Sequence, residues 1–116
     1  MAELKNMKCV PCESDVPAMT EDEIEEYQEK VSEWAVVDVD GVPHLIREFS
    51  FKNFAEALAF TDAVGAAAEE EGHHPVIELT WGRATVQWWT HNIEGLHQND
   101  FIMAAKTDEI FKSDFD

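Results

Sequence analysis

Hydrophobic and polar residues alternate along two stretches of the chain, and each stretch contains a turn signal. The first stretch, WAVVDVDGVPHLIREFSF, has Asp40-Gly41 near its middle, and this pair is typical of a tight hairpin turn. Pro43 cannot donate to a strand ladder, so the second strand is expected to begin near His44. The other stretch consists of VIELTW and ATVQWWT around Gly82-Arg83. The pattern therefore predicts two antiparallel hairpins.

Elsewhere the apolar residues recur with the period of a helix. Thr20 and Glu23 form a capping-box pattern that opens a short acidic helix over about 21–31. A long central helix is predicted from the N-cap Asn53 to the C-cap Gly72. Its core stripe is expected to comprise Phe54, Ala57, Leu58, Thr61, Val64, Gly65 and Ala68, and its opposite side Ala55, Ala59, Ala63 and Ala66.

A last helix is expected to start from a cap at Asn99 or Asp100 and to run through about Phe111. Its buried residues are expected to be Phe101, Ile102, Ala105 and Ile110.

The order of these elements, α-ββ-α-ββ-α, predicts the fold class. Two hairpins in one four-stranded antiparallel sheet, with the helices packed on one face, form a two-layer α+β domain. A chain of 116 residues suits one compact core rather than two. We therefore expect a single domain over 1–116, in which 1–19 is a flexible lead-in.

The composition of the chain limits the classes of molecule that it is expected to bind. The formal charge of −17, from 25 acidic and 8 basic residues, would repel phosphate backbones and anionic lipids, so neither direct nucleic-acid binding nor membrane binding is expected. No long apolar run and no secretory signal stands out, which predicts a soluble, cytoplasmic protein. The acidity itself fits a solvated surface, adaptation to high salt or attraction of a basic partner.

Cys9 and Cys12 form a lone CxxC motif, CVPC, near the N-terminus. A structural zinc site would need two further ligands, and a thioredoxin-like motif would need a strand entering a helix. The motif thus fits two reduced thiols in the lead-in, with a redox or metal role as the alternative.

Three of the five histidines stand at the open ends of the second hairpin. His73 and His74 precede its first strand, and His91 follows its second. Because the turn is centred near Gly82, antiparallel pairing should bring these ends together at one edge of the sheet. Pro75 favours an extended His74 and directs the pair away from the helix end.

Converging imidazoles fit a metal site or proton transfer, or each histidine could cap or fill space separately. No HxH or HxxxH spacing sets two of them on one regular face, and adjacent residues in an extended chain point oppositely. Acid–base chemistry fits better, since imidazole both donates and accepts protons near neutral pH. No metal ligand is predicted.

A longer motif surrounds these histidines. Glu69 is followed after three residues by HHP at 73–75, then by Trp81, Thr90-His91, Gly95-Leu96 and NDF at 99–101. In this combination the chain resembles the pterin-4a-carbinolamine dehydratases, known in animals also as the dimerization cofactor of a homeodomain transcription factor. Weaker similarity extends upstream through Glu33-Trp34 and REFSFKNFAEALAF. His97, where the family commonly has a hydroxyl residue, and the loop HNIEGL depart from the pattern.

The resemblance implies a hydro-lyase that needs no cofactor. The family's reaction removes water from 4a-hydroxytetrahydrobiopterin to give the quinonoid dihydropterin, which recycles the cofactor of aromatic amino-acid hydroxylases. By this resemblance His73 and His91 transfer protons, and His74 holds the substrate and stabilises developing charge. The implied substrate-binding residues are Glu69, Pro75, Thr90, Asn92, Ile93 and Asp100, of which Glu69 and Asp100 would orient the imidazoles.

Trp34, Trp81, Trp88 and Trp89 could stack on a pterin, but tryptophans of strands more often fill a core or an interface.

The resemblance also implies a homodimer or homotetramer. The apolar runs HLIREF and ATVQWWT are expected at exposed edges, which a twofold partner would cover. Whether the alanine side of the central helix pairs two dimers stays open, since alanine is also simply the best helix former. An alternative function is that of an interaction module that stabilises a partner's dimer.

Overall fold

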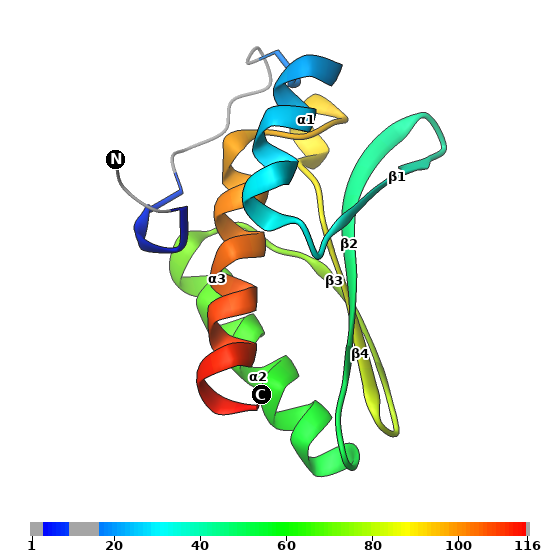
Figure 1. The fold of residues 1–116 in the computed structure, drawn as a ribbon, viewed down its shortest axis with the longest axis vertical. Helices are drawn as coiled ribbons and strands as arrows, with labels where there is room; N and C mark the ends of the chain where they lie inside the picture. The colour runs from blue at the N-terminus through cyan, green and yellow to red at the C-terminus, as the bar shows by residue number, and fades with distance from the viewer. Residues whose placement is uncertain (1–3, 10–16, 116) are drawn as a thin grey trace.

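The computed structural model describes residues 4–9 and 17–115 and has the predicted element order. A 3₁₀ turn, η1 (Leu4–Asn6), precedes the helix α1 (Glu21–Gln28), which continues as the 3₁₀ turn η2 (Glu29–Val31). The first hairpin, the central helix, the second hairpin and the last helix follow as β1 (Ala35–Val39), β2 (Val42–Ser50), α2 (Phe54–Glu71), β3 (Val76–Thr80), β4 (Arg83–Trp88), η3 (His91–Ile93) and α3 (Gln98–Asp114). Figure 1 shows the helices on one face of the sheet, so the predicted α+β class is confirmed.

The first hairpin turns where predicted, but β2 begins earlier than expected. Asp40 and Gly41 have φ values of 53° and 85°, the left-handed conformations that a two-residue turn requires. β2 starts at Val42 rather than near His44, and Pro43 pairs with Asp38 of β1. β4 pairs with β2 only from Leu45 onward, so the missing N–H of Pro43 breaks no ladder bond.

The strand order is β1-β2-β4-β3, which corrects the expectation about the sheet edges. HLIREF in β2 and ATVQWWT around β4 are the central strands and pair with each other, with Leu45 opposite Trp88. The edges are instead the shorter strands β1 and β3. Their outward side chains Val37, Val39 and Val76 are 36–40% exposed.

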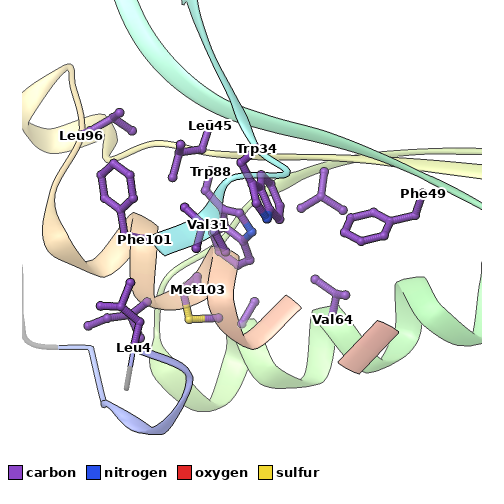
Figure 2. Close-up of a cluster of buried hydrophobic side chains, with 14 of the residues drawn as sticks. Leu4, Val31, Trp34, Leu45, Phe49, Val64, Trp88, Leu96, Phe101 and Met103 are labelled. Carbon is purple, nitrogen blue, oxygen red and sulfur yellow. The ribbon is translucent and has the colours of Figure 1, made fainter. Parts of the chain in front are cut away.

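The core lies between the sheet and the helices, as the labelled side chains in Figure 2 show. On α2 the buried residues are Ala57, Phe60, Val64 and Ala68. The buried face of the helix therefore differs in part from the predicted one. Phe54 and Leu58 are 44% and 41% exposed, whereas Phe60 is fully buried. Phe60 packs against Phe49 at 4.7 Å and Phe51 at 5.1 Å between ring centroids, and this contact sets which face of the helix points inward.

A polar cluster ties the sheet to α3. Arg47 of β2 lies 2.6 Å from Asp108 of α3, which also accepts a hydrogen bond from the indole N–H of Trp34 at 2.8 Å. Burial raises the pKa of Asp108, and these two donors oppose the rise.

Helix ends follow prediction at α2 and differ at α3. The Asn53 side chain accepts from the N–H of Glu56, and Gly72 ends α2 in the left-handed conformation, with φ 67°. The cap of α3 is His97, not Asn99 or Asp100, and the helix continues beyond Phe111. Among the described residues, no helix is long and apolar enough to cross a membrane.

Candidate active site

A cavity of about 520 Å³ lies where α2 ends and where the open end of the second hairpin meets the loop after β4. Val76 pairs with Gln87, so the residues that precede β3 and those that follow β4 come together there. The cavity is lined by Cys9, Glu71, Gly72, His73, His74, Trp89, Thr90, His91, Asn92 and Asn99. The three predicted histidines therefore share one cavity.

His73 is the most firmly held of the three imidazoles. Its Nε2 lies 2.6 Å from Oδ1 of Asp100, which is fully buried, and its ring stacks on the core residue Trp88 at 5.7 Å between centroids. Because a carboxylate only accepts hydrogen bonds, Nε2 carries a proton. Nδ1 is then the nitrogen that can accept or deliver a proton.

Asp100 connects three elements around the cavity. Its Oδ2 accepts from the hydroxyl of Thr90 at 2.8 Å and from the backbone N–H of His97 at 2.9 Å. The His97 side chain in turn accepts from the N–H of Asn99, so the α3 N-terminus is closed by a reciprocal capping box. Burial lowers the pKa of His97, and the nearby Asp100 opposes that shift.

His74 and His91 are more exposed than His73. Nε2 of His74 lies 2.6 Å from Oε1 of Glu69, and the two side chains are 61% and 78% exposed. A pair this exposed orients the imidazole but contributes little stability. His91 begins η3 and packs its ring against Trp89, with centroids 4.5 Å apart.

The N-terminal segment forms a wall of the cavity that the sequence analysis did not predict. Leu4 is buried against the core, and the backbone N–H of Cys9 donates to Oε1 of Glu71 at 2.7 Å. Burial, followed by the charge of Glu71, raises the pKa of the Cys9 thiol to about 12, so this thiol is neutral. Cys12, the second cysteine of the CxxC motif, lies outside the described residues.

The predicted site residues divide into two groups. His73, His74, His91, Thr90 and Asn92 line the cavity, whereas the remaining predicted residues Glu69, Pro75, Ile93 and Asp100 are not among its lining. Glu69 and Asp100 act on the cavity through His74 and His73. Their direct substrate contacts, like those of the other predicted residues, stay predictions.

Five lining residues were not predicted as site residues, namely Cys9, Glu71, Gly72, Trp89 and Asn99. Three of them had a signal in the sequence: Gly72 ends the helix directly before HHP, Asn99 belongs to the NDF motif, and Trp89 is one of the tryptophans that could stack on a pterin. Cys9 reaches the cavity through a contact 62 positions away in sequence, for which no local pattern exists.

The arrangement suits general acid–base chemistry. The cavity places a partly buried, carboxylate-held imidazole and two exposed imidazoles around one space. Among the residues that the structure describes, no three His, Cys, Asp or Glu side chains are grouped as metal ligands would be. The cavity can thus bind a small polar molecule and exchange protons with it.

Comparison with known proteins identifies the family. The family model described as pterin 4 alpha carbinolamine dehydratase matches residues 17–110. The chain belongs to the pterin-4a-carbinolamine dehydratase family. The family and the hydro-lyase class predicted from the sequence are therefore confirmed.

Relatives and solved structures of the same family extend the similarity over most of the chain. Proteins assigned as pterin-4-alpha-carbinolamine dehydratases from Chlorobium luteolum and Nitrosococcus oceani are 50% and 52% identical over 112 residues. These alignments cover 97% of this chain and 98% and 99% of the relatives.

Two solved structures share the fold. A transcriptional coactivator/pterin dehydratase from Brucella melitensis has a TM-score of 0.73 at 32% identity, covering 80% of this chain and 97% of that one. A pterin dehydratase-like protein identified as a RuBisCO assembly factor in the alpha-carboxysome has a TM-score of 0.56 at 26% identity, covering 66% and 87%.

Proposed function

We propose that the chain dehydrates 4a-hydroxytetrahydropterins to quinonoid dihydropterins in this cavity. The observation that carries the proposal is the convergence of His73, His74 and His91 on one cavity, with His73 held by the buried carboxylate of Asp100. Family membership supports the same reaction.

The reaction needs two proton movements, which two imidazoles can supply. The C4a–O bond breaks as a proton is delivered to the leaving oxygen, and the proton on N5 is removed as the C4a–N5 double bond forms. The products are water and the quinonoid dihydropterin, so atoms and charges balance. His73 and His91 carry these protons, and His74 binds the substrate, with its ring oriented by Glu69.

A dehydration assay with matched variants tests this proposal. Freshly prepared 4a-hydroxytetrahydropterin is followed as it loses water, with and without the purified chain. We expect the wild type to accelerate the reaction and His73→Ala or His91→Ala to lower kcat by about 10²-fold or more. A wild type that leaves the rate unchanged would refute the proposal.

Substitutions of two neighbouring glutamates test whether Glu69 orients His74 for substrate binding. Glu69→Ala frees the His74 imidazole and should raise KM, whereas Glu70→Ala removes the same side chain one position along α2. Glu70 does not line the cavity. Equal effects of the two substitutions would remove the orienting role from Glu69.

The proposed setting is tetrahydropterin recycling for aromatic amino-acid hydroxylases, in the cytoplasm and as a homodimer or homotetramer. We expect a dimer because the edge strands β1 and β3 carry partly exposed outward valines, and unpaired edges are usually covered. Light scattering at micromolar concentration tests it. A monomer mass with full activity would refute the dimer.

A second candidate function is protein binding through the outer face of α2. Phe54 and Leu58 on this helix are exposed, and the name of the Brucella melitensis structure includes a coactivator. Pulldown of a defined partner, repeated with Leu58→Glu and Ala59→Glu, tests this function. Capture that survives both substitutions would exclude this face.

A further inference from the structure

His44 is buried on the side of the sheet that faces away from the helices. Its neighbour in β2, Leu45, belongs to the core, so the alternation of side chains along a strand points His44 to the opposite face. The residue is nevertheless only 5% exposed. The partner that covers it lies directly after the end of β4.

That partner is Trp89. Leu45 pairs with Trp88, and continuing this register puts His44 directly across from Trp89. The imidazole and the indole lie parallel, with centroids 3.8 Å apart and 4° between their planes. One face of the Trp89 ring is therefore covered by His44.

The Trp89 ring also contacts a histidine of the cavity. The His91 ring lies 4.5 Å from the Trp89 ring at an angle of 47°. The same indole therefore contacts both imidazoles, stacked with His44 and tilted against His91. Trp89 thus connects His91, which lines the cavity, with His44, which is not among its lining residues.

His44 is itself fixed in place. Its Nδ1 lies 3.0 Å from Oε1 of Gln87, and because an amide oxygen only accepts hydrogen bonds, Nδ1 carries a proton. Gln87 stands two residues before Trp89 on β4 and so lies on the same face of the sheet. The stack on Trp89 and this hydrogen bond together hold the His44 ring in one orientation.

His91 needs such support more than the other two histidines do. His73 and His74 are each bonded to a carboxylate. Within the described part of the chain, no side-chain hydrogen bond orients the imidazole of His91, and its ring contact is with Trp89. When an exposed side chain is held by a contact with one ring, its orientation depends on how rigidly that ring is held.

We propose that His44 is a positioning residue for the dehydration reaction, which fixes the Trp89 indole against which the His91 imidazole packs in the cavity. This inference rests on the proposed function. An aromatic contact of this kind corresponds to a change of about 3- to 10-fold in rate. His44→Ala should therefore lower kcat by about 3- to 10-fold and change KM by less than about twofold.

Two further variants separate positioning from general damage. His44→Phe loses the hydrogen bond to Gln87 but keeps a ring stacked on the indole. Because the ring is kept, kcat should stay within about twofold of the wild-type value. Glu48→Ala alters an exposed side chain of β2 (55% exposed), four residues from His44 and on the same face of the sheet, and should leave kcat unchanged. A loss in all three variants would mean that the sheet, not the stack, is responsible.

Proton NMR of the His91 imidazole gives a readout that does not depend on turnover. Ring protons above an indole resonate upfield, and in His44→Ala those of His91 should move downfield, while His44→Phe should retain the wild-type shift. Unchanged His91 resonances in His44→Ala, or wild-type kcat in that variant, would overturn the inference. If the wild type did not dehydrate the pterin, the proposed function would fail, and a downfield shift would still establish the stack.

Discussion

Substitution of Asp100 by asparagine keeps the shape of a fully buried side chain and reverses one of its hydrogen bonds. Asp100 accepts from three donors, the Nε2–H of His73 at 2.6 Å, the Thr90 hydroxyl at 2.8 Å and the His97 N–H at 2.9 Å. In Asp100→Asn the amide oxygen can keep the last two. The amide N–H₂ then faces Nε2 of His73, so two donors meet unless His73 moves its proton to Nδ1.

The magnitudes follow from these contacts. Loss of one charge-assisted bond should lower the free energy of unfolding by about 1.5–3 kcal/mol. With the proton on Nδ1, the nitrogen that is available for proton transfer can no longer accept a proton, so kcat should fall by about 10²- to 10⁴-fold. Asp100→Ala leaves three donors without an acceptor and should cost about 3–5 kcal/mol of stability.

Urea unfolding and dehydration kinetics of the two variants check this reasoning. We expect Asp100→Asn to remain folded and to lose most of its activity, and Asp100→Ala to be the less stable of the two. A folded Asp100→Asn variant with wild-type kcat would refute the idea that Asp100 sets the protonated nitrogen of His73.

Three smaller predictions concern the surroundings of the cavity. Gly72→Ala should lower the free energy of unfolding by about 1–2 kcal/mol because φ is 67° there. Gly65→Ala lies inside α2, with open space for a methyl group, and should raise the free energy of unfolding by about 0.5–1 kcal/mol. Equal effects of the two substitutions in urea unfolding would contradict this. His97 has a lowered pKa in the folded chain, so the unfolded chain binds its proton first and stability falls as pH drops through about 6.5; His97→Ser should flatten that decrease in a pH series of unfolding curves, and an unchanged slope would count against it. In a Cys12→Ser background, Cys9 should react with iodoacetamide near pH 8 about 10³-fold more slowly than an ordinary cysteine, because its pKa is raised to about 12; a rate like that of a free thiol would be incompatible with its burial.

The local parts of the fold could be predicted because local chemistry determines them. Asp40-Gly41 forms its turn and Asn53 and Gly72 cap α2, since each residue has the conformation or side chain that its position needs. The cap of α3 was predicted wrongly because histidine is not a usual cap. There Asp100 occupies the third helical position, where it also accepts hydrogen bonds from His73 and Thr90, 27 and 10 residues away in sequence.

The parts that could not be predicted depend on contacts between distant segments. Two hairpins can form one sheet in several ways, because either strand of one can pair with either strand of the other. Nothing in the sequence of β2 or β4 alone shows that these two are the central strands. The inward face of α2 is set by Phe60 packing on Phe49. At the site, hairpin pairing was enough to bring the histidines together, whereas the Cys9–Glu71 contact and the stack of His44 on Trp89 appear only in the folded chain.

The most direct test of the central claim is the rate at which 4a-hydroxytetrahydropterin disappears with the purified wild-type chain, with buffer alone and with a His73→Ala/His91→Ala double variant shown to be folded. The account predicts a rate with the wild type well above that in buffer, and a kcat for the double variant at least about 10²-fold below the wild-type value. A wild-type rate equal to that in buffer, or a double variant as fast as the wild type, would contradict the claim that these imidazoles catalyse the dehydration.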